Sequence, residues 1–204
     1  MTKNLDSSGL RSIAESYDLF FIDLWGVVHN GIKLHKKAIE ALAEIDKAKK
    51  NYVLLTNAPR PNNTVKIFLE KMGMDKNIRK KVYTSGEAAL SYLKKNHSDE
   101  NFFHIGPPRD YDLFSNFKNN KTEDIKKSSF FLCTGLFTDH SEELNYYKDL
   151  FKNFISKKMI CTNPDLIVDR GKKRELCAGS VAMVFEKMGG KVIYFGKPFP
   201  EVYN

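Results

Sequence analysis

Three short apolar segments, each followed by a segment with helical spacing, constrain the fold of this chain more than any other feature. The first, Leu19–Leu24 (LFFIDL), is almost continuously apolar, and the others are Tyr52–Leu55 and Val82–Thr84. Such runs are typical of strands inside a parallel sheet that is covered on both faces. The intervening segments Lys36–Lys50 and Pro61–Met72 are expected to be helices. This alternation predicts right-handed crossovers and a doubly wound parallel α/β sheet.

The remainder of the chain repeats the alternation with a different spacing. Further strands are expected at Phe102–Ile105, Phe130–Cys133, Met159–Thr162 and Val192–Phe195, and further helices at 86–95, Ser141–Lys157 and Gly179–Met188. A short amphipathic helix over 10–17, capped by Ser7 or Ser8, is expected to precede the first strand. We therefore expect a second α/β unit to be inserted after the first three strands.

The composition is that of an ordinary globular protein. The 204 residues are 42% hydrophobic and 28% charged, and a chain of this length can bury a core. No apolar run reaches the roughly 18 residues that a membrane-spanning helix needs, and Met1–Ser8 lacks the apolar stretch of a signal peptide. We therefore expect no membrane partner and a cytoplasmic location.

Neither the cysteines nor the net charge indicates a function of its own. Cys133, Cys161 and Cys177 lack metal-ligand spacing and are expected to be reduced, although Cys177 precedes a helix start that can lower a thiol pKa. The net charge is +8, but the lysines are spread along the chain and interleaved with acids. Spread lysine is typical of a solvated surface. We therefore expect no nucleic-acid partner, and a positive field that favours small anionic substrates.

Polar residues at the ends of the first two strands are the first functional signal. Asp23 ends the first strand and Thr56 ends the second, so both should lie at the carboxyl edge of the sheet, where ligands bind. Asn57 follows Thr56, and Lys197 lies in a Gly-Lys-Pro sequence far along the chain. Phosphoryl transfer to a carboxylate needs such a set, namely a nucleophilic acid, a hydroxyl and amide that hold phosphate, and a lysine. Each residue alone would more often be a turn, cap or solvated residue.

Six segments together resemble the motifs of one family. FFIDLWGVVHNG (20–31), VLLTNAPR (53–60) and YFGKPFPEVY (194–203) resemble the first three motifs of the haloacid dehalogenase (HAD) superfamily. TSGEAALSYL, TNPD and AGS resemble its class IIA subfamily, which includes pyridoxal and nitrophenyl phosphatases. That subfamily inserts an α/β cap between motifs two and three. The resemblance implies a HAD-like core at 1–86 and 191–204, and an α/β cap at 87–190.

The resemblance also implies a role for each site residue. Asp23 would be the nucleophile that forms an aspartyl-phosphate, and its carboxylate would contact Mg²⁺ together with the main-chain carbonyl of Trp25. Thr56 and the amide of Asn57 would hold the transferring phosphoryl group, and Lys197 would pair with the phosphate and Asp23. The implied function is magnesium-dependent hydrolysis of a small phosphorylated metabolite. A homodimer is left open.

Trp25 is a departure from the family pattern. In the phosphatases this position is an aspartate that protonates the leaving alcohol and later activates water. A main-chain metal contact survives the change to tryptophan, but proton transfer, which contributes about 10²- to 10⁴-fold in rate, does not. His29 is considered as a substitute acid, although an exposed flap residue is the favoured interpretation. The alternative function is a catalytically weak or inactive protein that binds phosphorylated ligands.

The fourth motif of the family, which supplies further carboxylates for Mg²⁺, has no counterpart in the sequence. The chain ends seven residues after Lys197. We therefore expect it to be part of a longer protein. With three core strands only, the strand at Leu19–Leu24 would form an uncovered sheet edge.

Overall fold

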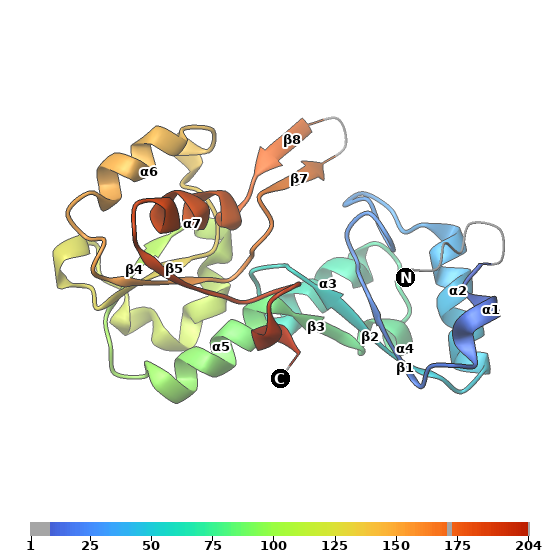
Figure 1. The fold of residues 1–204 in the computed structure, drawn as a ribbon. Helices are drawn as coiled ribbons and strands as arrows, with labels where there is room; N and C mark the ends of the chain where they lie inside the picture. The colour runs from blue at the N-terminus through green and yellow to red at the C-terminus, as the bar shows by residue number, and fades with distance from the viewer. Residues whose placement is uncertain (1–8, 171–172, 204) are drawn as a thin grey trace.

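The computed structural model describes residues 9–170 and 173–203, which form two lobes (Figure 1). The first lobe contains a parallel sheet of order β1-β2-β3, made of β1 (Leu19–Ile22), β2 (Asn51–Thr56) and β3 (Val82–Thr84). Its helices are α1 (Arg11–Ala14), α2 (Lys36–Lys47), α3 (Asn62–Lys71) and α4 (Lys76–Arg79). The expected N-cap of α1 at Ser7 or Ser8 lies outside the described residues. The expected strand and helix order of this lobe is confirmed.

Strand β1 is an edge strand, and this is where one expectation is wrong. Phe20 and Ile22 pack into the apolar cluster of the first lobe, whereas Leu19 and Phe21 are 46% and 53% exposed. The continuous apolar run had predicted cover on both faces. Leu19 and Phe21 lie on the other face of the sheet, which the described residues leave partly exposed, and β1 pairs with β2 alone among them. The expected uncovered edge at this strand is present.

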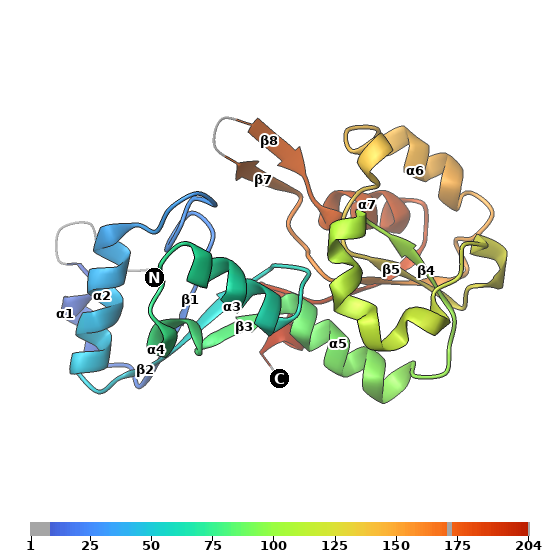
Figure 2. The same cartoon turned by 180° about the vertical axis from the view of Figure 1, so that it is seen from behind.

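The second lobe is an α/β/α sandwich on a parallel sheet. Its strands, in the order β4-β5-β6-β9, are β4 (Phe102–Ile105), β5 (Phe130–Cys133), β6 (Lys158–Cys161) and β9 (Lys191–Tyr194). Helices α6 (Leu144–Phe151) and α7 (Ala178–Lys187) cover one face, and α5 (Ser85–Asn96) and the 3₁₀ segment η1 (Pro108–Asn120) cover the other. Phe130 faces α5 and η1, whereas Phe131 faces α6 and α7, because successive side chains of a strand point to opposite faces of the sheet. Figure 2 shows the same layers from behind.

Strand β9 corrects the expected boundary between the two units. Residues 191–204 were assigned to the HAD-like core, but Val192 pairs with Met159 and Ile193 with Ile160 in the sheet of the second lobe. Its apolar side chains complete the sandwich there. The chain returns to the first lobe only after Phe195, which places Lys197 beside β1 and β2. The division into core and cap is otherwise kept as an interpretation.

A β-hairpin was missed by the sequence analysis. Strands β7 (Ile167–Arg170) and β8 (Lys173–Leu176) pair antiparallel and project from the second lobe toward the first (Figure 1). The sequence predicts a loop in this region. The expected helix over Ser141–Lys157 is also shorter, because the 3₁₀ turn η3 (Thr138–His140) precedes it and a further turn follows. The remaining 3₁₀ turns are η2 (Ile125–Lys127) and η4 (Pro200–Val202). Across the described ranges, no helix is long and apolar enough to cross a membrane.

Candidate active site

A cleft of about 1200 Å³ is lined by residues of both lobes and of the β7-β8 hairpin. It contains all five of the side chains that the sequence analysis selected, namely Asp23, Trp25, Thr56, Asn57 and Lys197. The carboxyl ends of β1 and β2 form its floor on the first lobe. On the second lobe its wall is formed by the segments that follow β4 and β5. The carboxyl ends of both parallel sheets thus open into one space, as expected for a ligand site.

Asp23 and Lys197 form an ion pair at this floor, although 174 positions separate them in the chain. Lys197 Nζ lies 2.5 Å from Asp23 Oδ1 and donates a second hydrogen bond, of 2.8 Å, to the Leu55 carbonyl. The Leu24 amide also donates to Asp23 Oδ1, at 2.8 Å. Oδ2 accepts no hydrogen bond from the residues that the structure describes. One oxygen is therefore held in place while the other is available to a substrate.

Asn57 fixes the position of Lys197. Its Oδ1 accepts from the Lys197 amide at 2.7 Å, and its Nδ2 donates to the Lys197 carbonyl at 3.1 Å and to Asp165 Oδ1 at 2.8 Å. Gly196 has a φ of +131°, and a Cβ there would lie 2.5 Å from a side-chain atom of Pro164 and 2.8 Å from Asn57 Oδ1. Only glycine fits this approach. The Asn57 side chain is thus occupied by protein, and its main-chain amide is the group left for a ligand.

Asp165, in the TNPD segment, was not selected as a site residue. Burial raises the pKa of this carboxyl, while the hydrogen bond from Asn57 and the charge of Lys197 lower it and the charge of Asp23 raises it. Asp165 therefore senses both charges of the ion pair. The TNPD motif was the signal that could have identified it.

Thr56 is buried at the end of β2, and its Oγ1 accepts a 3.3 Å hydrogen bond from the Ala58 amide. The hydroxyl proton remains for donation to a ligand, because a threonine hydroxyl both donates and accepts.

Cys177 does not have the lowered thiol pKa that its position before a helix start suggested. Burial raises the pKa of its thiol to about 12, so the expected acidification is absent.

Trp25 links the first lobe to the hairpin. Its indole Nε1 donates to the Asp169 carbonyl at 2.9 Å, and its ring packs on Gly31, where a Cβ would lie 2.7 Å from Cη2. Gly31 also has a φ of +84°. The tryptophan thus occupies, with an apolar ring, the position that holds a carboxylic acid in the phosphatases.

His29 is buried, so the favoured interpretation of an exposed flap residue is wrong. Only 3% of the residue is exposed, and its ring contacts Trp25 and Phe68. Nδ1 accepts a 3.0 Å hydrogen bond from the Gly31 amide, which places the proton of the neutral ring on Nε2. Burial lowers the pKa of His29, and the charge of Asp23 acts in the opposite direction.

The residues expected to hold a metal fit magnesium in kind. Mg²⁺ takes oxygen ligands and usually keeps several waters beside one or two carboxylates. The Asp23 carboxylate and the Trp25 carbonyl, two residues apart on one side of the cleft, are such oxygen donors. No cluster of three or more His, Cys, Asp or Glu suited to a metal occurs in residues 9–170 and 173–203.

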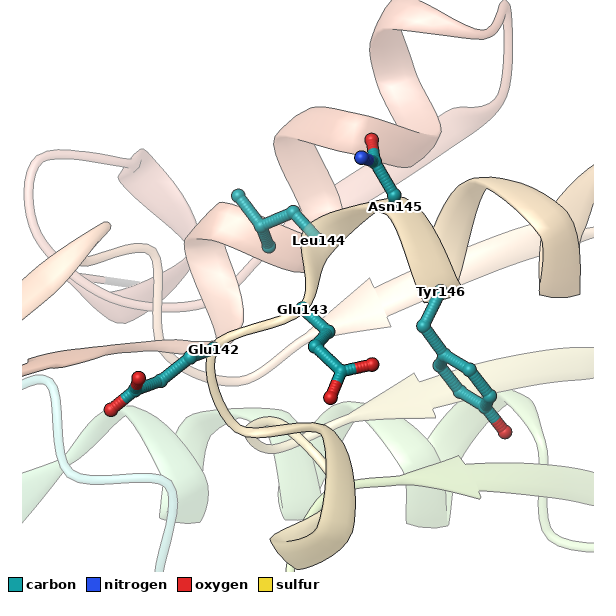
Figure 3. Close-up of a pocket in the computed structure, with 5 residues that line it drawn as sticks. All are labelled: Glu142, Glu143, Leu144, Asn145 and Tyr146. Carbon is teal, nitrogen blue, oxygen red and sulfur yellow. The ribbon is translucent and has the colours of Figure 1, made fainter.

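A smaller hollow of about 550 Å³ lies at the start of α6, apart from the ion pair (Figure 3). Its lining residues are Glu142, Glu143, Leu144, Asn145 and Tyr146. None of them is a cation that would attract a phosphate. Glu142 also borders the large cleft. The chemistry therefore belongs to the large cleft.

Comparison with known proteins shows the family of this chain. Residues 20–118 match the model of haloacid dehalogenase-like hydrolases. A hydrolase of the haloacid dehalogenase-like family from Brucella suis is 31% identical, with a TM-score of 0.85, over 95% of this chain and 71% of its own. The chain belongs to the haloacid dehalogenase-like hydrolase family. A search of curated proteins found no match.

Two other solved structures share the fold of this HAD-like chain. A 4-nitrophenylphosphatase from Thermotoga maritima is 24% identical, with a TM-score of 0.72, over 94% of this chain and 72% of its own. A glycerol phosphate phosphatase from Mycobacterium tuberculosis, solved in complex with magnesium, is 19% identical, with a TM-score of 0.66, over 94% and 58%. At these identities the likenesses show the fold alone, which agrees with the α/β fold that the sequence predicted.

Proposed function

We propose that this HAD-like hydrolase transfers the phosphoryl group of a small phosphorylated metabolite to Asp23 and then to water. The observation that carries the proposal is the Asp23–Lys197 ion pair, held at the floor of a cleft between two lobes. A half-buried lysine beside the nucleophile neutralises the negative charge of a phosphate group that binds in the cleft. Thr56 and the Asn57 amide would complete the phosphate site.

In the first step, a carboxylate oxygen of Asp23 forms a bond to phosphorus while the bond from phosphorus to the leaving oxygen breaks. Lys197 stays fixed by the Leu55 carbonyl and by Asn57, so the charge it offers need not reorganise. In the second step, the oxygen of a water molecule forms a bond to phosphorus while the bond from phosphorus to the Asp23 oxygen breaks. The water proton leaves with inorganic phosphate, and the Asp23 carboxylate is restored. Magnesium, held by Asp23 and the Trp25 carbonyl, would supply further charge neutralisation at the phosphoryl oxygens.

Proton transfer is the weak point of this sequence of steps. An alkoxide leaving group takes up a proton, and Trp25 carries no titratable group at the position that supplies it in the phosphatases. We therefore propose that acyl phosphates and other substrates with acidic leaving groups react faster than alkyl phosphates. We also propose a cytoplasmic location for this protein.

The test is the Asp23→Asn variant, assayed for phosphate release and, by intact mass, for covalent phosphate after mixing with acetyl phosphate and Mg²⁺. Both signals should fall to background, because an amide is not a nucleophile toward phosphorus. Asp18→Asn is the matched control, since Asp18 lies in the same lobe with a fully exposed side chain. Unchanged phosphate release in Asp23→Asn would overturn the proposal.

The second candidate is a protein that binds phosphorylated ligands and does not turn them over. Trp25 favours it, since the indole is engaged by the Asp169 carbonyl and cannot act as an acid. Calorimetric binding of inorganic phosphate by the unaltered protein, without phosphate release from any ester or acyl phosphate, would decide for this candidate.

A further inference from the structure

The lysine and arginine side chains that line the cleft are paired with acids in all but one case, within the described part of the chain. Four lysine and arginine side chains line it in the described part of the chain: Arg60, Arg109, Lys173 and Lys197. Lys197 pairs with Asp23 at 2.5 Å, Arg60 with Asp110 at 3.2 Å, and Lys173 with Glu142 at 3.5 Å. Arg109 has no ion-pair or hydrogen-bond partner among residues 9–170 and 173–203. Its guanidinium is the cation left for a ligand.

Arg109 lies on the opposite wall from the phosphate site. It belongs to η1, two residues after Pro107 at the carboxyl end of β4, and the residues that follow β5 line the cleft beside it. The first lobe offers Lys197, paired with Asp23 at the carboxyl edge of its sheet, and the second lobe offers Arg109 at the carboxyl edge of its own sheet. A ligand between the lobes therefore meets one cationic group on each side.

The neighbourhood of Arg109 connects to the ion pair through Cys177 and Asp165. The charges of Asp165, Glu175 and Arg109 all act on the Cys177 thiol. Asp165 Oδ1 accepts a hydrogen bond from Asn57 Nδ2, which donates a second one to the Lys197 carbonyl. Arg109 is exposed, whereas its neighbour Asp110 is buried against Arg60. The fixed neighbour anchors the backbone, and the guanidinium remains accessible from the cleft.

We infer that Arg109 binds a second anionic group of the substrate, so that the preferred substrate class is a phosphorylated metabolite that also carries a carboxylate or another phosphate. This inference rests on the proposed function, whose phosphate site it complements. A guanidinium presents a planar pair of donors that match carboxylate and phosphate oxygens, which a neutral alcohol cannot satisfy. Arg109 is thus a specificity-determining residue, and the reaction itself belongs to Asp23 and Lys197.

The experiment compares phosphoglycerate with glycerol phosphate, which differ by a carboxylate in place of a hydroxymethyl group, in the unaltered protein and in Arg109→Gln. The ratio of kcat/KM for phosphoglycerate to that for glycerol phosphate should fall about tenfold in Arg109→Gln, mostly through KM, because a hydrogen bond to a charged group is lost. Arg109→Lys should retain part of the preference. Arg11→Gln, on the exposed helix α1, is the matched control and should leave the ratio unchanged.

Binding separates this inference from the proposed function. Calorimetry in an Asp23→Asn background, where turnover is removed, should show the same loss of preference when Arg109→Gln is added. A bisphosphate set against its monophosphate distinguishes a phosphate from a carboxylate as the second group. Turnover with an unchanged ratio in Arg109→Gln overturns the inference and leaves the proposed function intact. Selective binding through Arg109 without any turnover supports the inference and overturns the proposed function.

Discussion

Trp25 is the residue that distinguishes the two candidate functions of this protein, hydrolysis of phosphorylated substrates and binding without turnover. Replacing it in Trp25→Asp restores a carboxylic acid two residues after the nucleophile. If proton transfer limits the reaction, turnover of alkyl phosphates should rise by about 10²-fold or more, the scale of an acid–base contribution. Turnover of acetyl phosphate should rise much less, because its leaving group departs without a proton. Steady-state phosphate release from both substrates is the measurement.

The structure indicates which control this substitution needs. Trp25 donates a hydrogen bond to Asp169 and packs on Gly31, so its loss also loosens the contact to the hairpin. Trp25→Phe removes the same hydrogen bond without supplying an acid, and its melting temperature should fall by a similar amount. A folded Trp25→Asp protein that binds phosphate but hydrolyses no alkyl phosphate faster than Trp25→Phe would favour the binding protein.

At the scale of elements, the sequence predicted best where burial alone decides the structure. Strands β3, β4 and β5 have the expected bounds, because each is a short run whose residues are buried or half-buried on both faces. The β7-β8 hairpin was missed, since its exposed, charged residues carry no alternating apolar pattern. The local sequence does not show which sheet β9 joins, because the pairing of β9 with β6 depends on the packing of the second lobe.

A buried histidine links two strands of the second lobe, and its lowered pKa leads to a prediction about stability. His104, on β4, is hydrogen-bonded through Nε2 to Thr134 Oγ1 at 2.8 Å, just after β5. Burial, assisted by the charge of Lys121, lowers the pKa of His104 from 6.5 to about 3. Between these pH values the unfolded chain binds a proton that the folded protein excludes, so stability falls as the pH falls through 6.5.

This site alone should cost about 2 kcal/mol of unfolding free energy between pH 7 and pH 5. Urea unfolding at the two pH values gives the difference, and His104→Gln should reduce it while lowering stability at both. His97 gives the comparison variant, because its imidazole lies in the same lobe, is 13% exposed and is paired with Glu100. An undiminished pH dependence in His104→Gln would show that other groups cause the acid sensitivity.

At the scale of the whole molecule, the site could be predicted only in part. The sequence identified Asp23, Thr56 and Lys197, because their order in the chain matches a known set of motifs. It did not select Arg109, whose proposed role depends on the carboxyl edges of the two sheets facing one cleft. Nor did it identify the partners that fix each charge, since contacts between distant segments leave no local pattern.

The ion pair between Arg60 and Asp110 joins the two lobes at the wall of the cleft and provides the last prediction. Arg60 follows β2 in the first lobe, and Asp110 lies buried in η1 of the second, with Arg60 Nε 3.2 Å from its Oδ1. Burial raises the pKa of Asp110, and the charge of Arg60 opposes that rise. Arg60→Met leaves the carboxylate unpaired and should lower the unfolding free energy by about 2 to 4 kcal/mol at pH 7.

The double variant Arg60→Met with Asp110→Leu tests whether the loss comes from the unpaired charge. Replacing a buried pair by apolar groups of similar size is often nearly neutral, so the double variant should recover most of the stability that Arg60→Met loses. The stability of Arg60→Met should also improve as the pH falls, because protonation removes the buried charge and a carboxyl with a raised pKa favours the folded state at low pH. Additive losses in the two single variants, with no recovery in the double variant, would mean that the lobes are held by packing and that the ion pair contributes nothing to their union.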